Sequence, residues 1–497
     1  MREKSPRREK MARLREAGGM WADRVFLGCV LAAAPLFLFP RARYSWVGIV
    51  LGGLLVARGA IWGRFLERTP LDWGIGGLGI MILATCFVVP DIEFSMGKIA
   101  GAVYGILLYY AAVAVIRTER AIKAGVYGFI VVGVWLAIIG IVGVIPMPTE
   151  PAFEKIQSSL TKNIPKHNWT LPGAEAGFNP NAVGGSLLWI IPLALFVAGA
   201  MLGKGKTDEA RGSGHEAEGI GSLAYEGPKS VPREVPERGQ GLGPERTGKS
   251  SRAPKPFSKW LSRIPGLLLF SLASVVLLAA LFLSQSYGAW IALILSVWLI
   301  GLSPKWKAWS LAGALVLCGA VYAIGPLRRA VAPFTITGTA GTGETAPTAN
   351  VLQVKTEQRY GFWTAGIAAI RRAPVLGVGL NRLRLNPGIT YEGAHAHNQF
   401  ITTGAELGIP GLVAYIAILV GAGWMAWVIW KRSKDRWMRA AALGLAAGQV
   451  AFHIFGLGDA ITLGSKPNAL FWVSLALLTA IYRGVRVENI SGRISKR

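Results

Sequence analysis

The sequence predicts an all-α polytopic membrane protein, and two observations support this fold class. Of its 497 residues, 52% are hydrophobic and only 16% are charged, with 18 tryptophans and a mean hydropathy of +0.42. A soluble globular protein has a lower apolar and a higher charged fraction. The second observation is a series of apolar runs that can cross a hydrocarbon core of about 30 Å as helices. By hydropathy, about 12 such runs are recognisable, and we expect about 12 transmembrane helices.

The predicted transmembrane helices form three groups along the chain. Helices 1–6 lie within residues 24–202, helices 7–9 within 263–326, and helices 10–12 within 409–484. The individual runs are 24–40, 45–62, 73–90, 99–116, 125–146, 181–202, 263–284, 287–303, 308–326, 409–430, 438–456 and 469–483. The first run follows a basic segment, residues 1–23, and no small-residue cleavage pattern comes after it. We therefore expect this run to stay in the membrane as a helix.

The excess of basic residues indicates how these helices are oriented. The formal net charge is +26, which also suits a nucleic-acid-binding protein, but lysine and arginine accumulate in the cytoplasmic loops of membrane proteins. With the N-terminus in the cytoplasm, nearly every basic turn falls on the inner side: Arg64, Arg68, Arg117, Arg120, Lys123, Lys305, Lys307, Lys431, Arg432, Lys434, Arg436 and the tail 485–497. We expect a multi-pass protein of the inner or plasma membrane, with both termini cytoplasmic and no nucleic-acid partner.

Three longer segments lie between the predicted helices. Residues 147–180 and 327–408 fall on the outer side, and residues 203–262 fall on the inner side. The inner segment is rich in Gly, Pro, Glu, Arg and Lys and nearly free of large apolar residues. It buries too little surface to fold, so we expect a disordered cytoplasmic linker between two six-helix halves.

The outer loop 327–408 holds the densest group of reactive side chains in the sequence. Few helix breakers occur between Asn350 and Arg372, and apolar residues recur there at helical spacing. We therefore predict a helix on or near the membrane surface that Pro374 ends. A second helix is predicted from about His397, within its first turn, to Leu407, because the Gly408 that follows is a natural C-cap.

Histidine and arginine side chains in this loop suggest its chemistry. A neutral histidine accepts a proton from a hydroxyl group near pH 7, so His397 is a candidate general base. Guanidinium groups match phosphate oxygens in bidentate geometry, which makes Arg359, Arg382 and Arg384 candidate anion ligands. For Arg382 and Arg384, contact with lipid headgroups is the alternative interpretation.

A metal site is the second interpretation of the histidines. His395 and His397 lie two residues apart, so on an extended strand they point to one face and form half of such a site. No third ligand lies at a suitable spacing, and Asp459 is remote in sequence. We therefore expect proton transfer and no bound metal.

Two carboxylates and a glycine pair complete the candidates of the loop. Glu392 and Glu406 are the candidate carboxylates, and Glu406 either assists the base or makes a local hydrogen bond at a helix end. The segment Gly377-Val378-Gly379 either presents backbone amides to a phosphate or forms a simple turn. Both questions stay open at the level of sequence.

The same residues resemble the O-antigen ligase and O-antigen polymerase family of polytopic glycan transferases. The most specific match is His397-Asn398, followed after residues 399–407 by Gly408-Ile409-Pro410-Gly411. Arg359 with Trp363, and residues 374–379, resemble the family's Arg-x-x-x-Trp and Pro-x-x-Gly-x-Gly segments. Weaker matches are Phe178-Asn179-Pro180-Asn181 and Leu283-Ser284-Gln285-Ser286. Together these motifs cover roughly the C-terminal two-thirds of the chain.

The resemblance implies an inverting, metal-independent glycosyltransferase of polysaccharide or lipopolysaccharide biosynthesis, without a cofactor. The histidine that matches His397 activates an acceptor hydroxyl, and the donor is a glycan on a polyprenyl diphosphate such as undecaprenyl diphosphate. A family arginine that binds the diphosphate matches Arg359. A second one follows the serine at the start of helix eight, where this chain has an uncharged tyrosine, so diphosphate binding is either weaker or taken over by another cation such as Arg382 or Arg384. The candidate substrate-binding residues are Tyr287, Arg382, Arg384, Asn398 and Glu406.

Several functions remain open at this stage. The acceptor, whether a lipid core, a protein or another lipid-linked glycan, decides between a ligase and a polymerase, and residues 147–180 contain no motif that identifies it. A transporter or flippase is the alternative from another class, because about 12 spans and a central linker occur in transporters. An inactive relative that serves as a scaffold is a third possibility, which Tyr287 favours and which His397 and Arg359 oppose.

Overall fold

The computed structural model describes residues 6–34, 53, 59, 67–143, 179–202, 264–284, 286–301, 351–386 and 395–494. All the regular structure within these ranges is helical, which confirms the all-α class. The predicted linker 203–262, the span predicted at 308–326 and Glu392 lie outside the described residues. So do nearly all of the span predicted at 45–62 and of the outer segment 147–180.

The helices follow one another along the chain with short connections where these are described. In order they are α1 Pro6–Ala32, α4 Asp72–Val88, α5 Ile92–Val115, α6 Glu119–Gly143, α8 Pro180–Leu187, α9 Ile191–Leu202, α12 Ile264–Leu283, α13 Tyr287–Gly301, α16 Val351–Arg372, η3 Leu383–Leu385, α17 Gln399–Arg432, α18 Arg436–Phe455, η4 Lys466–Asn468 and α19 Ala469–Ile494. Helix α16 confirms the helix predicted between Asn350 and Arg372.

The chain is a multi-pass membrane protein. Among the described residues, 7 helical segments are long and apolar enough to cross a membrane: Ile92–Val115, Glu119–Ile141, Asn181–Leu202, Gly266–Leu283, Gln399–Arg432, Arg436–Phe455 and Lys466–Arg486. Helices α4 and α13 are apolar but shorter. The total of about 12 spans stays a prediction.

Two predicted helix boundaries differ from those in the structure, the first because of a charged residue and the second because of a proline. Helix α5 begins at Ile92 and not at residue 99, because the charge of Lys98 lowers the hydropathy of a segment that is nevertheless helical. The run 181–202 forms two helices, α8 and α9, which residues 188–190 separate. Pro192 has no amide hydrogen, so it cannot make the helical bond that would join them.

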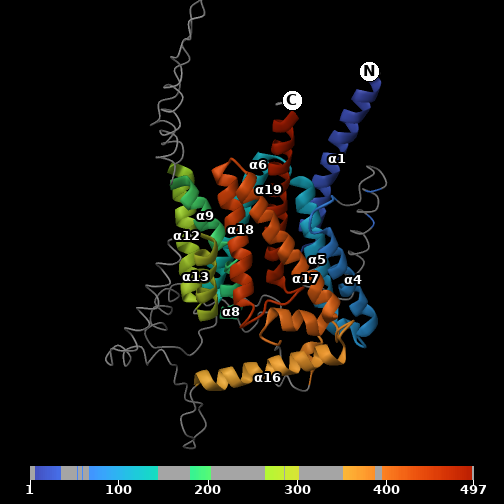
Figure 1. Cartoon of the computed structure of the whole chain (residues 1–497), viewed down its shortest axis with the longest axis vertical. Coiled ribbons are helices and arrows are strands. Elements are labelled where there is room, and N and C mark those ends of the chain that lie inside the picture. The colour runs from blue at the N-terminus through green and yellow to red at the C-terminus, as the bar shows by residue number, and fades with distance from the viewer. Residues whose placement is uncertain are drawn as a thin grey trace, which may run out of the picture.

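The long helices form a bundle whose two ends differ (Figure 1). Helix α1 begins and α19 ends at the same end of the bundle, whereas α16 lies crosswise over the opposite end. Helices α4 and α17, α5 and α19, and α9 and α18 pack against one another in pairs. The segments on either side of α17's first turn therefore lie far from both termini.

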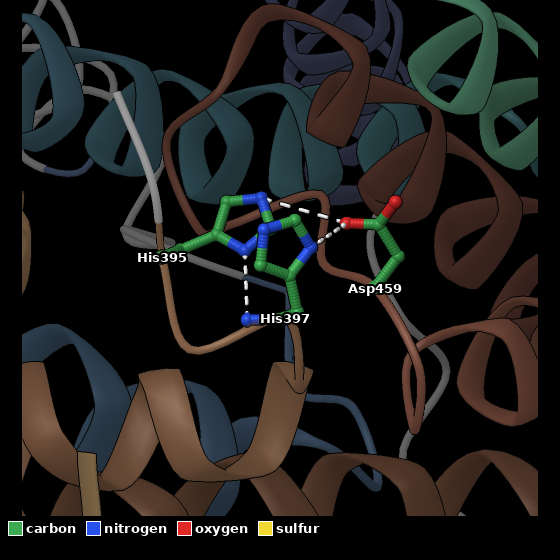
Figure 2. A group of neighbouring side chains, drawn as sticks. All are labelled: His395, His397 and Asp459. Carbon is green, nitrogen blue, oxygen red and sulfur yellow. Dashed lines mark hydrogen bonds and ion pairs between the residues drawn. The ribbon is translucent and has the colours of Figure 1, made fainter. Parts of the chain in front are cut away.

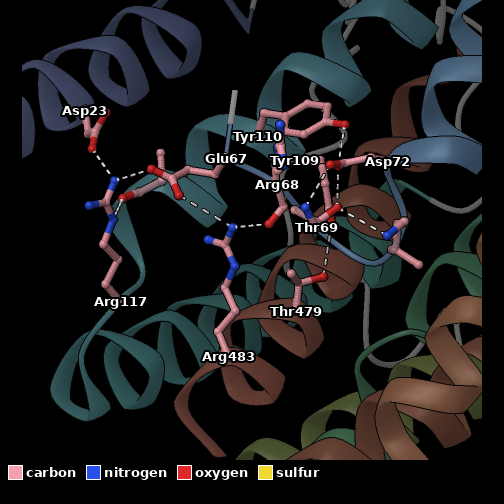
Figure 3. A network of polar contacts seen from close by, with 12 residues as sticks. Asp23, Glu67, Arg68, Thr69, Asp72, Tyr109, Tyr110, Arg117, Thr479 and Arg483 are labelled. Carbon is pink, nitrogen blue, oxygen red and sulfur yellow. Dashed lines mark hydrogen bonds and ion pairs between the residues drawn. The ribbon is translucent and has the colours of Figure 1, made fainter. Parts of the chain in front are cut away.

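A network of ion pairs and hydrogen bonds joins α1, α5 and α19 (Figure 3). Arg117, just after α5, lies 2.6 Å from Asp23 of α1 and 2.9 Å from Glu67. Arg483 of α19 lies 3.5 Å from the second oxygen of Glu67. Exposed ion pairs contribute little one at a time, but Arg117 and Glu67 each take part in two ion pairs and so connect all three helices. The network fixes the bundle on which the site is built.

Helix α17 is interrupted at Gly408, as the sequence predicted. Gly408 has φ 71° and ψ 179°, a conformation that is essentially restricted to glycine. At this break the amide of Ile409 donates to Pro374 O at 2.7 Å, and the amide of Val378 donates to Ala405 O at 2.9 Å. The turn after α16 therefore pairs with the break in α17, and the helix resumes immediately, with Pro410 in its first turn.

We expect Gly408→Ala to lower the free energy of unfolding by about 2–3 kcal/mol, because a Cβ in this backbone conformation is strained. That Cβ would also meet the carbonyl of Val375. Thermal unfolding of the detergent-purified protein measures the loss.

Gly423→Ala in the same helix is the matched control. A Cβ at Gly423 meets no heavy atom within 4 Å, and alanine is the better helix former by up to about 1 kcal/mol. Equal melting temperatures for the two variants would contradict the role given to Gly408.

Candidate functional site

Segments that are far apart in sequence meet at the end of the bundle that α16 covers. They are the turn that follows α16, residues 395–398 before α17, and residues 456–465 between α18 and η4. The amide of Gln399 donates to Gly456 O at 2.6 Å, and the Asn398 side chain donates to Leu457 O at 3.2 Å. These bonds attach the start of α17 to the loop after α18.

Asn398 is the N-cap of α17. Its side-chain oxygen accepts hydrogen bonds from the amides of Phe400 at 3.0 Å and Ile401 at 3.1 Å, the usual role of asparagine at this position. The prediction that His397 sits in the first turn was wrong, because the helix begins at Gln399, directly after the Asn398 cap. Both polar atoms of the Asn398 side chain are bonded within the protein, so its main effect is to position His397.

The centre of the site is a triad of His395, His397 and Asp459 (Figure 2). Oxygen Oδ1 of Asp459 lies 3.2 Å from Nδ1 of His397 and 3.6 Å from Nε2 of His395. The amide of Ala460 donates to the same oxygen at 2.8 Å. Distance along the sequence had excluded Asp459 as a third partner of the two histidines, and the structure shows that this was wrong, since the loop after α18 returns to the start of α17.

The hydrogen bonds determine which nitrogen of each imidazole carries the proton. The amide of His397 donates to Nδ1 of His395 at 3.1 Å, so in neutral His395 the proton is on Nε2 and faces Asp459. Burial lowers the pKa of His395 to about 4, although the charge of Asp459 opposes the shift. His395 is therefore neutral near pH 7.

Asp459 is ionised in this environment. Burial by itself raises the pKa of its carboxyl group, but the hydrogen bond with His397, the charges of both histidines and the Ala460 amide together lower the pKa below its ordinary value. An ionised carboxylate only accepts hydrogen bonds. His397 consequently carries its proton on Nδ1, which leaves the lone pair of Nε2 available to accept another proton.

The triad also has the composition of a metal site, since its potential ligand atoms all lie within 4.8 Å of one another. In the hydrogen-bond network described above, His395 Nε2 and His397 Nδ1, the two nitrogens nearest Asp459, both hold protons. Binding of a cation between these atoms would displace both protons.

Helix α16 contributes two side chains beside His397. The ring of Phe362 stacks on the imidazole with centroids 5.4 Å apart and planes at 24°, and His397 itself has φ 46°, which is uncommon for a residue other than glycine. Nη1 of Arg359 lies 3.9 Å from the position of a Cβ built on Gly458, next to Asp459. Arg359 is exposed, so its guanidinium is accessible next to the triad.

Arg382 and Arg384 form a second group at the N-terminal end of α5. Their guanidinium carbons lie 5.9 and 5.8 Å from the centre of the Phe94 ring, a distance at which cation–π attraction operates. Asn381, with φ 66°, donates from its side chain to Phe94 O at 2.9 Å. The turn 381–385 is thus attached to α5.

Glu406 of α17 stabilises the turn 381–385. Its side chain is buried, and its carboxylate accepts hydrogen bonds from the amides of Asn381 and Leu383. Of the two interpretations left open by the sequence, this contact matches the local hydrogen-bond role.

The segment 377–379 forms a turn. The amide of Gly377 donates to Ala373 O at 3.0 Å, and the amide of Gly379 donates to Glu406 O at 3.0 Å. The amide of Val378 donates to Ala405 O, so all three amides of this segment are bonded within the protein. Of the two interpretations of this segment, the turn is the one observed.

Lys98 was not among the site residues predicted from the sequence. Its ammonium group, on α5, donates a hydrogen bond to the hydroxyl of Thr462 in the loop after α18. The signal was present in the sequence, because a lysine next to an apolar run of membrane-spanning length is a candidate functional residue.

Tyr287 is the first residue of α13, and its side chain is 55% exposed. Among the described residues, no hydrogen bond or ion pair joins it to the triad. Its neighbour Ser286 donates to the Asn181 side chain at 2.9 Å. This bond brings together the two weaker motifs of the sequence, one before α8 and one before α13.

We expect the stability of the protein to increase with pH between about 4 and 6.5, in part because of His395. In the unfolded chain its pKa is near 6.5, and in the folded chain it is about 4, so the unfolded state binds more protons within this window and stability is lost as the pH falls. The shift corresponds to at most about 3 kcal/mol.

His395→Asn tests this expectation, because an asparagine oxygen can still accept the His397 amide but does not titrate. Melting temperatures measured from pH 4.5 to 7.5 should depend less on pH in the variant than in the parent. Parallel pH profiles would show that His395 is not protonated on unfolding in this range.

Residues 272–416 of the chain match the family model described as O-antigen ligase. The match runs from α12 to the part of α17 just beyond the Gly408 break and includes Arg359, His395 and His397, whereas Lys98 and Asp459 lie outside it. No curated protein sequence matches the chain.

Proposed function

Because the chain belongs to the O-antigen ligase family of membrane glycosyltransferases, we propose that it moves a glycan from a polyprenyl diphosphate to an acceptor hydroxyl. The observation that carries this proposal is the hydrogen bond between Asp459 and Nδ1 of His397. It leaves Nε2 of His397 as a proton acceptor, and a carboxylate behind an imidazole stabilises the cation that forms when the proton is accepted.

In the proposed reaction His397 is the general base. Nε2 takes the proton of the acceptor hydroxyl, whose oxygen attacks the anomeric carbon of the donor glycan. The bond from that carbon to the diphosphate oxygen breaks, and its electron pair leaves with the polyprenyl diphosphate. Attack opposite the leaving group inverts the configuration at the anomeric carbon.

Positive side chains would stabilise the leaving diphosphate. Arg359 lies beside the loop that carries Asp459, and Arg382 and Arg384 extend the positive charge along α5. Guanidinium groups stay charged and bind phosphate oxygens in pairs. Tyr287 would contribute one uncharged hydrogen bond, and the chain needs no metal ion if these cations bind the diphosphate.

The sidedness of the site supports transfer on the outer face. The triad residues come shortly before α17 and shortly after α18, and these two helix ends lie at the end of the bundle that α16 crosses, opposite to the start of α1 and the end of α19. If the basic termini are cytoplasmic, as the distribution of lysine and arginine predicts, the triad is extracytoplasmic. Lipid-linked donor would then reach it sideways from the membrane.

The first experiment compares the parent with His397→Ala, purified at equal yield, in transfer of a polyprenyl diphosphate glycan in liposomes with a chelator present. We expect transfer by the parent and a loss of at least about 100-fold in the variant, the usual contribution of a general base. A product extended by many repeat units indicates a polymerase, and addition of one glycan to a separate acceptor indicates a ligase.

Transfer that is equal in both proteins would contradict the role of His397. Transfer by the parent only when the chelator is absent would contradict metal independence. If neither protein transfers any glycan under conditions in which the donor binds, transport or a scaffold role is the function to examine next.

Asp459→Asn should reduce transfer by at least about 100-fold, because an amide does not stabilise a protonated imidazole. The variant retains an oxygen that can accept a hydrogen bond from the Ala460 amide, so its melting temperature should change little. A rate within threefold of the parent would show that Asp459 does not act through His397.

A further inference from the structure

Lys98 holds a position that the fold keeps tightly defined. The chain approaches α5 so closely here that a Cβ at Gly464 would meet the carbonyl of Lys98, and one at Gly101 would meet the carbonyl of Gly464. The Lys98 ammonium group donates to Thr462 in the same loop. Since this loop also carries Asp459, the lysine is fixed relative to the triad.

The charge of Lys98 is not balanced by an ion pair. In the part of the chain that the structure describes, no carboxylate forms an ion pair with Lys98 or with Arg384. The buried carboxyl group of Glu406 interacts electrostatically with both cations, and it also accepts from the amides of Asn381 and Leu383. Both cations are half-buried, and Arg384 has a single neutral acceptor, Asn381 at 3.4 Å.

The two cations belong to the surroundings of the triad. The charges of Lys98 and Arg384 each lower the pKa of His395, so both lie within electrostatic range of it. An ammonium group has three N–H donors, of which Thr462 takes one. Burying a positive charge whose N–H donors have no acceptor costs free energy, and a bound anion offsets this cost.

We propose that Lys98 and Arg384 form a binding subsite for a phosphate or diphosphate group beside the His395, His397 and Asp459 triad, with Lys98 as its principal charge. The inference rests on the proposed function, because it names how the same site binds its substrate. The phosphate belongs to the lipid-linked donor or to a phosphorylated acceptor. Charge supplied from α5 would compensate for the uncharged tyrosine at position 287.

The test uses the purified full-length chain in nanodiscs and measures binding of undecaprenyl diphosphate without a glycan, so that no catalysis is required. Lys98→Met should weaken binding by about tenfold or more, the effect of losing a charge-assisted hydrogen bond to phosphate. Lys98→Arg keeps the charge and should stay within about threefold of the parent, because guanidinium also binds phosphate.

Two further variants serve as controls. Arg372→Gln removes one positive charge from the exposed end of α16, where the side chain donates only to Ala368 O, and should bind the lipid as the parent does. His397→Ala should bind it normally while failing to transfer glycan. Together these two results would show that the effect of Lys98→Met comes neither from a general loss of surface charge nor from a loss of the proposed catalytic base.

The outcomes distinguish the subsite from the proposed function. If the parent binds the lipid and Lys98→Met binds it equally, with unchanged KM values for donor and acceptor, the subsite is overturned and the transferase proposal stands. If only the KM for a phosphorylated acceptor rises, the subsite stands and its phosphate is the acceptor's. If the parent does not bind the lipid, both proposals fail.

If Lys98→Met does not fold, lipid binding is measured for Arg384→Gln instead. Normal binding by that variant overturns the subsite.

Discussion

One carboxylate oxygen organises the candidate site. Oδ1 of Asp459 faces the protonated nitrogens of His395 and His397 and accepts the Ala460 amide. Because His395 also accepts the His397 amide, the two imidazoles and the backbone between them form a closed set of donors and acceptors. Only one tautomer of each histidine satisfies that set. A free Nε2 on His397, which the proposed reaction needs as its proton acceptor, follows from this constraint.

The backbone around the triad is shaped so that this contact can exist. The break at Gly408 lets the short first part of α17 lie against the turn after α16, through the Ile409 and Val378 amides. The long second part of the helix then continues into the bundle. A straight α17 would lack the break against which this turn packs, so the glycine that interrupts the helix helps to place the arginines and the histidines on one end of the molecule.

Local features of the chain were predictable because they depend on nearby residues. The α16 helix follows from apolar spacing, and the break at Gly408 follows from a glycine and a proline two residues apart. Apolar length predicted most of the described spans. Hydropathy failed at α5, where it assigned charged Lys98 to a loop, because a mean over a window cannot distinguish a lysine outside a helix from one that turns inward to Thr462.

The sequence by itself determined the membrane class, the resemblance at His397 and Arg359, and the break at Gly408 that ends the first part of α17. These depend on composition and on contacts within a few residues. Only the tertiary structure decided that Asp459 contacts the histidines and that Lys98 contacts the loop carrying Asp459, because the two residues lie 62 and 299 positions away from His397 in the chain. Their approach depends on how α5 and α18 pack in the bundle, and spacing along the sequence contains no information about such packing.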